Sequence, residues 1–106
     1  MAFTFTDENV KEIIATGQPV VIDCWATWCG PCVAMAPIID ELAKEYEGRA
    51  VIGKYNVEDE GELSAEYRIM SLPTILFFKD GQKANIRLTG SQSRQTLVEK
   101  IEELLG

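Results

Sequence analysis

Three short apolar runs constrain the fold of this chain more than any other feature of its sequence. They cover residues 19–25, 50–56 and 74–79. Nearly continuous apolar runs of this length are typical of strands that are covered on both faces of a sheet. Segments with helical spacing of apolar residues lie between the first two runs, so the alternation favours parallel strands joined by crossover helices.

The remaining segments complete an order of strand, helix, strand, helix, strand, short helix, hairpin and helix. The expected helices cover residues 7–15, 32–46, 62–67 and a last segment that follows Ser93. Further strands are expected at residues 2–6 and 83–89. Thr6 is a candidate N-cap, and Asp80-Gly81 is typical of a two-residue hairpin turn. We therefore expect an α/β fold, with a mixed sheet and helices on both faces.

Length and charge restrict the classes of protein that fit. The chain has 106 residues and is expected to form a single domain, 1–106. Its 17 acidic and 10 basic residues give a formal net charge of −7, which makes nucleic acid and anionic membranes poor partners. With no targeting segment visible and no apolar run of roughly 20 residues, we expect a cytoplasmic monomer.

Two cysteines close together carry the chemistry. The segment 28–32 reads WCGPC, and it lies between a predicted buried strand and a predicted helix. Unpaired N–H groups and partial positive charge at a helix N-terminus stabilise a thiolate, and cysteine pKa values there fall by one to several units from about 8.5. Pro31 suits an early helix position, because its missing N–H costs nothing there. This placement predicts a reactive dithiol–disulfide pair formed by Cys29 and Cys32.

Two other uses of a cysteine pair fit the sequence less well. A zinc site needs two more ligands, but the chain has no histidine and Cys24 is its only other thiol. A cysteine hydrolase lacks its usual histidine base for the same reason. Metal binding and hydrolysis are therefore the weaker alternatives.

The wider sequence around the cysteines closely resembles the active site of the thioredoxin family. Segment 25–32 reads WATWCGPC, and further matches lie at Asp23, Pro37, 54–57, 72–74, 78–81 and Gly90. The resemblance covers almost the whole chain. It implies the thioredoxin fold, a five-stranded mixed sheet in the order 1-3-2-4-5 flanked by four helices.

The resemblance also implies a general protein-disulfide reductase. Cys29 is then the exposed attacker that forms a mixed disulfide with the substrate, and Cys32 resolves it. A thioredoxin reductase that contains a flavin (FAD) restores the dithiol with NADPH, so this chain itself is expected to bind no cofactor and no metal. Two alternatives stay open: an oxidase or isomerase of the same fold, and a binding subunit that does not use its thiols.

Asp23 interrupts an apolar strand, and two interpretations fit it. Burial would raise the pKa of its carboxyl towards neutrality, which suits a general base. An edge position open to water would leave it ordinary. The resemblance favours the first interpretation and gives Asp23 the proton of Cys32. It also places Lys54 near Asp23, although an ordinary solvated lysine fits the sequence equally well.

The resemblance implies a docking surface for substrates around the cysteine pair. Its expected members are Trp28, Leu72, Pro73, Thr89 and Gly90, with Trp25, Gly30 and Pro31 supporting the active-site loop. The Leu72–Pro73 bond is expected to be cis. Gly90 also fits a plain turn that needs positive φ.

Cys24 departs from the family pattern, which usually has a large apolar residue between the aspartate and the tryptophan. On a strand, its side chain points away from that of Asp23. We expect a small buried apolar residue, with a regulatory thiol as the alternative.

Overall fold

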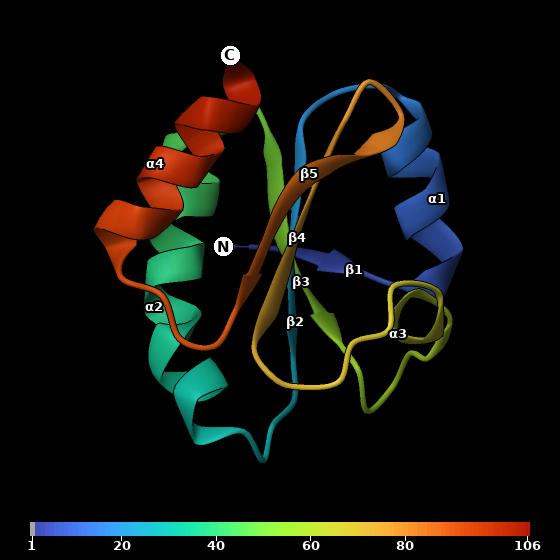
Figure 1. The fold of residues 1–106 in the computed structure, drawn as a ribbon, viewed down its shortest axis with the longest axis vertical. Coiled ribbons are helices and arrows are strands. Elements are labelled where there is room, and N and C mark those ends of the chain that lie inside the picture. Colours follow the sequence, from blue (N-terminus) through green and yellow to red (C-terminus); the bar gives the residue numbers. More distant parts are fainter. Residues whose placement is uncertain (1) are drawn as a thin grey trace.

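A computed structural model describes residues 2–106 of the chain and contains every expected element (Figure 1). The elements are β1 Phe3–Phe5, α1 Asp7–Ala15, β2 Val20–Trp25, α2 Gly30–Glu45, β3 Val51–Asn56, α3 Glu62–Glu66, β4 Thr74–Lys79, β5 Gln82–Thr89 and α4 Arg94–Leu105. The strands form one sheet in the order β1-β3-β2-β4-β5. The first three strands are mutually parallel, and β4 and β5 are antiparallel to their neighbours. The expected fold class is confirmed.

Each face of the sheet is covered by a pair of helices (Figure 1). Helices α2 and α4 cover one face, where Met35, Ile39 and Leu97 pack against Val21 of β2. Helices α1 and α3 cover the other, where Val10 and Leu63 join Ile22, Phe5, Tyr55 and Phe78 in a second core. Alternate residues of β2 therefore enter opposite cores, which explains why every residue of the strand except Asp23 is apolar.

Most elements start or end within a residue or two of the expected bounds, and helix α2 differs at both ends. Helix α2 begins at Gly30, two residues before the expected start, because Pro31 fits the first turn and the Cys29 sulfur accepts a hydrogen bond from the Cys32 N–H at 3.2 Å. Its last residue is Glu45, one earlier than expected. The hairpin at Asp80-Gly81 is confirmed, since both residues have positive φ, 58° and 80°, as a tight turn of this type requires.

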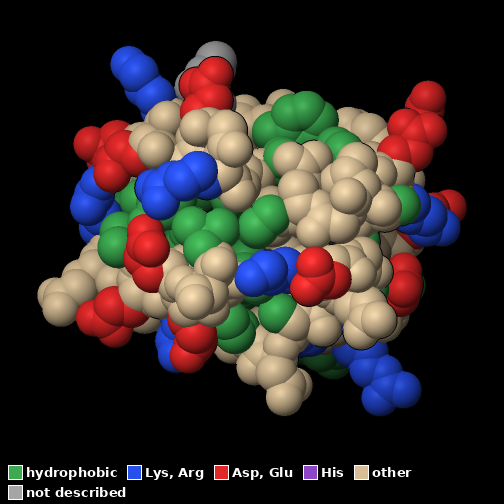
Figure 2. All heavy atoms as spheres, turned by 90° about the horizontal axis from the view of Figure 1, so that it is seen from above, with side chains coloured by type: hydrophobic (Ala, Val, Ile, Leu, Met, Phe, Trp, Pro, Cys, Tyr) green, Lys and Arg blue, Asp and Glu red, His purple; other side chains and the backbone are tan. Residues whose placement is uncertain are grey.

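The loops that follow β2 and α3 lie together at the lower end in Figure 1. Figure 2 shows the upper end, where acidic and basic side chains are interspersed among apolar ones. None of the helices within residues 2–106 has the length and apolar character that crossing a membrane requires.

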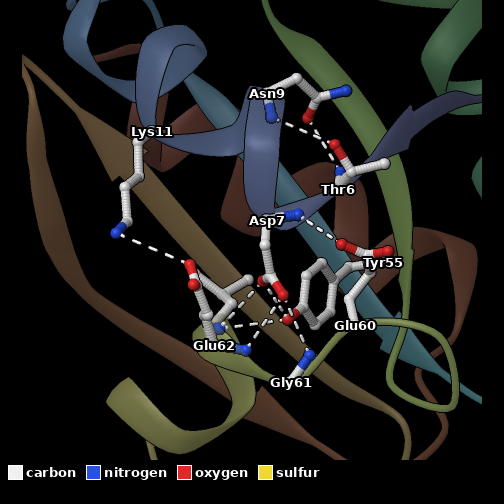
Figure 3. Close-up of polar contacts among 9 residues, drawn as sticks. Thr6, Asp7, Asn9, Lys11, Tyr55, Glu60, Gly61 and Glu62 are labelled. Atoms are coloured by element: carbon white, nitrogen blue, oxygen red, sulfur yellow. Dashed lines mark hydrogen bonds and ion pairs between the residues drawn. The ribbon is translucent and has the colours of Figure 1, made fainter.

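Asp7 joins the start of α1 to the start of α3 (Figure 3). Its carboxylate accepts hydrogen bonds from the Tyr55 hydroxyl at 2.6 Å and from the N–H groups of Gly61, Glu62 and Leu63 at 3.1–3.3 Å. Burial opposes ionisation, but these donors outweigh it and lower the pKa of the Asp7 carboxyl. One side chain thus accepts hydrogen bonds from three N–H groups that α3 leaves without helical partners at its start.

We expect Asp7→Ala to lower the free energy of unfolding by about 2 kcal/mol at neutral pH, the upper range for loss of a helix cap. Since the pKa of Asp7 is lower in the folded state, its contribution is complete above the unfolded pKa of 3.8 and disappears as the pH falls through the folded value. Urea denaturation at neutral pH and at pH 3 measures both effects. Glu8→Ala, which removes an exposed acid from the same helix turn, is the control. An equal loss in both variants would contradict the assignment.

Candidate active site

The site is built where β2 ends and α2 begins. Ala26, Cys29 and Cys32 form a small buried cluster, and Trp25, Val57 and Leu72 pack against it. These residues come from the end of β2 and the start of α2 with the loop between them, from the residue after β3, and from the α3–β4 loop. The cysteine pair therefore lies at the lower end of Figure 1, where segments from three parts of the chain meet.

Cys29 and Cys32 are joined by a disulfide, with their Cα atoms 5.3 Å apart. Cys29 is the N-cap of α2, and its sulfur accepts the hydrogen bond from the N–H of Cys32. The positive end of the helix dipole points at this sulfur. An N–H group and the positive end of a helix dipole favour negative charge on a sulfur in this position.

The exposure of the two cysteines differs from the expectation. Cys29 is only 5% exposed and Cys32 1%, so the expectation of an exposed attacker was wrong for the oxidised form. The physical reason is the packing of Ala26, Trp25 and Leu72 around the disulfide. Trp28, by contrast, is 71% exposed next to the pair. Its indole ring therefore offers a broad apolar surface to solvent beside the disulfide.

Asp23 is buried under α2. It is 1% exposed, and neither carboxylate oxygen has a hydrogen-bond partner. It occupies the same face of β2 as Val21, which packs against Met35 of α2. Burial raises the pKa of Asp23 to about 7, although the positive charge of Lys54 lowers it in part. The water-exposed alternative is excluded, and the carboxyl is poised to exchange a proton near neutral pH.

Lys54 lies beside Asp23 on the neighbouring strand, where the two residues are register partners. Its ammonium nitrogen is 4.0 Å from an Asp40 carboxylate oxygen and 5.3 Å from the centre of the Trp25 ring. The expected proximity to Asp23 is therefore present. Asp40 was not singled out from the sequence, because it looks like an ordinary member of the polar face of α2.

The α3–β4 loop brings a cis proline to the site. The Leu72–Pro73 bond is cis, as the resemblance implied, and Leu72 packs against the cysteine cluster. The Pro73 carbonyl accepts a hydrogen bond from the Gly90 N–H at 2.8 Å. Gly90 has φ of 87°, so the turn alone accounts for a glycine, and the space around its Cα is open. Thr89 pairs with Thr74 at the end of β5 and is exposed.

Cys24 takes no part in this arrangement. It is fully buried in the core under α1 and α3, and burial raises the pKa of its thiol to about 12. The expectation of a small buried residue is confirmed.

Other residues of the site were missed from the sequence. Val57 packs on the cysteine cluster, and the Glu58 carboxylate accepts hydrogen bonds from the Thr27 N–H at 2.6 Å and the Thr27 hydroxyl at 2.7 Å. These contacts join segments about 30 residues apart, and no local sequence pattern predicts such contacts. Within residues 2–106, no group of three or more histidine, cysteine, aspartate or glutamate side chains is arranged to hold a metal ion.

Comparison with known proteins identifies the family to which the chain belongs. The family model named Thioredoxin matches residues 1–103. The chain belongs to the thioredoxin family. Thioredoxins of Chlorobaculum thiosulfatiphilum and of a Nostoc species (Thioredoxin 1) are 38% and 39% identical to it, and the alignments cover 98% and 94% of this chain and 96% and 94% of theirs. The M-type chloroplastic thioredoxin of Spinacia oleracea is 42% identical over 94% of this chain, which spans 55% of the spinach protein.

Membership of the thioredoxin family identifies the Cys29–Cys32 disulfide as the redox-active centre. The chain is a thiol–disulfide oxidoreductase that acts by dithiol–disulfide exchange, and its activity is the reduction of protein disulfides. Thioredoxins need no bound cofactor, and they generally work with thioredoxin reductase and disulfide-containing proteins.

Proposed function

We propose that Cys29 attacks the disulfides of substrate proteins and that Cys32 resolves the product. The observation that carries this assignment is the hydrogen bond from the Cys32 N–H to the Cys29 sulfur at the positive end of α2. The Cys29 thiolate breaks the substrate S–S bond, forms a mixed disulfide and expels one substrate thiolate. The Cys32 thiolate then attacks the Cys29 sulfur, which closes the Cys29–Cys32 bond and expels the second. Two electrons pass to the substrate, and both expelled thiolates take up protons.

Asp23 accepts the proton of Cys32 in this scheme. A general base is most effective when its pKa is close to the working pH, and burial brings the pKa of Asp23 to about 7. Its position under the first turns of α2 supports the role, and Lys54 tunes the carboxyl by its positive charge. The carboxylate has no competing hydrogen bond in the oxidised form.

Substrates dock against the surface around the disulfide. Trp28 supplies the exposed apolar contact, and Leu72 and Pro73 offer their backbone to an extended substrate segment in the manner of strand addition. Thr89 and Gly90 border the same surface, while Trp25, Gly30 and Pro31 shape the loop beneath it.

A flavin-containing thioredoxin reductase supplies electrons from NADPH to the oxidised pair. The chain acts as a monomer in the reducing environment of the cytoplasm, with neither nucleic acid nor membranes as partners. Its acidic net charge of −7 and a cysteine pair suited to exchange rather than to structural bridging support this setting.

The test measures NADPH consumption with a thioredoxin reductase and insulin as the protein disulfide. We expect turnover with the wild-type chain and none with Cys29→Ser. We expect Cys32→Ser to accumulate a mixed disulfide with insulin, detected by non-reducing electrophoresis and released by dithiothreitol. Cys24→Ser is the matched control and should keep its turnover, because that thiol is buried elsewhere. No turnover by the wild-type chain, or turnover by Cys29→Ser, would refute the proposal.

A further inference from the structure

The segment that presents Leu72 and Pro73 begins at the end of α3. The N–H of Ile69 bonds to the Ser64 carbonyl at 2.9 Å, and the N–H of Arg68 bonds to the Ala65 carbonyl at 3.4 Å. Arg68 is left-handed, with φ of 51°. This pattern is a Schellman motif, which closes a helix but leaves the carbonyls of the residues at its very end without helical donors. Here those carbonyls belong to Tyr67 and Arg68.

Arg87 of β5 donates to both of these carbonyls. Its two terminal guanidinium nitrogens lie 2.6 Å from the Tyr67 oxygen and 3.0 Å from the Arg68 oxygen. Arg87 is the register partner of Leu76, whose side chain lies in the core under α1 and α3. The guanidinium thus reaches from the edge of the sheet to the start of the loop, and its planar fork fits two acceptors at once.

The other end of the loop has its own contacts. The Thr74 hydroxyl donates to the Ser71 carbonyl at 2.7 Å, and the Gly90 N–H donates to the Pro73 carbonyl at 2.8 Å. Between the two ends lie Met70, which is almost fully exposed, and Leu72, which touches the cysteine cluster. Arg87 therefore supplies side-chain hydrogen bonds at the start of the loop, where Tyr67 and Ile69 also pack against the core under α1 and α3.

We propose that Arg87 is a positioning residue for protein substrates, because its two hydrogen bonds fix the loop that carries Leu72 and Pro73 beside the disulfide. The proposal rests on the proposed docking role of that loop. A protein disulfide must align its backbone with the loop, so freeing one end of the loop slows its reaction. A small aromatic disulfide reaches the Cys29 sulfur without that alignment, so its rate depends on the thiolate alone.

The experiment uses the pre-reduced chain, so that the reductase plays no part, and compares its rate constants with insulin and with Ellman's reagent. For Arg87→Gln we expect the insulin rate constant to fall about tenfold, since small misplacements of a docking group have effects of this size or more. The rate constant with Ellman's reagent should stay within about twofold of wild type. Arg87→Lys should fall between wild type and Arg87→Gln, because an ammonium offers charge without the planar fork.

Two further measurements separate positioning from other causes. Lys83→Gln removes a positive charge from the same strand and leaves both loop contacts intact, so it should react like wild type. Hydrogen exchange in a peptide covering residues 67–73 should quicken in Arg87→Gln and not in Lys83→Gln. An unchanged insulin rate, an equal loss with both disulfides, or unchanged exchange would overturn the inference about Arg87. Failure of the wild-type chain to reduce insulin would instead refute the reductase mechanism and the inference that depends on it.

Discussion

Replacing Asp23 with Asn is expected to stabilise the oxidised protein by about 4 kcal/mol at pH 9 and hardly at all at pH 3. The pKa of Asp23 is about 7 in the folded state against 3.8 for an ordinary aspartate, and each pKa unit corresponds to about 1.4 kcal/mol. Between these two values the folded chain holds a proton that the unfolded chain has released. Stability therefore falls as the pH rises through this range and levels off above it. Asparagine has no charge to bury, so the variant escapes this loss.

Guanidinium denaturation of the oxidised form, followed by circular dichroism at several pH values from 3 to 9, measures the difference. Asp59→Asn is the matched control, since it removes an exposed carboxylate and should leave the pH dependence unchanged. A gain in stability that is the same at every pH would show that Asp23 is not titrating near neutrality in the folded chain.

The same substitution is expected to slow the reduction of insulin. An asparagine cannot take the proton of Cys32, so the rate should fall most near pH 7 and recover as hydroxide takes over at higher pH. An unchanged rate between pH 6 and 9 would contradict the role of Asp23 as the base. A gain in stability together with a loss of activity is the expected result if the buried Asp23 carboxylate destabilises the fold but is needed as a base.

The sequence patterns predicted the secondary structure well because each pattern was local. The apolar run at residues 74–79 became β4 without a change of boundary, and the Asp80-Gly81 turn formed as expected. Thr6 is the N-cap of α1, with its hydroxyl accepting from the Asn9 N–H. The start of α2 was placed too late, since its cap is a cysteine sulfur rather than one of the usual oxygen side chains. The strand order itself came from the family resemblance.

What the patterns could not supply are contacts between residues far apart in the chain. Asp7 was correctly placed at the start of α1, but the four groups that donate hydrogen bonds to its carboxylate lie 48 to 56 residues away in the chain. Arg87 lies within the strand expected at residues 83–89, and only the folded sheet brings it to the end of α3. In the active site, the pairing of Lys54 with Asp40 was invisible for the same reason. Periodicity reports which face a residue occupies, not which partner it meets there.

The contact between Gly53 and β1 was also not visible in the sequence, and it predicts a large loss of stability when Gly53 is replaced. It lies inside β3, where its neighbour across the ladder is Phe3 of β1. A Cβ atom added to Gly53 would lie 2.8 Å from the carbonyl carbon of Phe3, closer still to its oxygen, and 2.7 Å from the ring of Phe5. The backbone of β1 can pack this closely only because position 53 carries no side chain.

We expect Gly53→Ala to lower the free energy of unfolding by about 3 kcal/mol, the upper range for overpacking a core. The obstacle is backbone, so a change of rotamer cannot relieve it, and β1 must shift as a unit. That shift also exposes Phe5, a fully buried ring whose burial alone is worth about 1.5–3 kcal/mol. Thermal unfolding should show a midpoint more than about 10 °C lower.

Gly30→Ala provides the matched control for this prediction. An added Cβ at Gly30 meets nothing within 4 Å, and the residue opens a helix, so its stability should stay within about 0.5 kcal/mol of wild type. The comparison separates the general effect of replacing a glycine from the contact with β1. Equal midpoints for the two variants would mean that β1 can move away from β3 at little cost. In that case the three-residue strand Phe3–Phe5 would contribute little to the stability of the sheet.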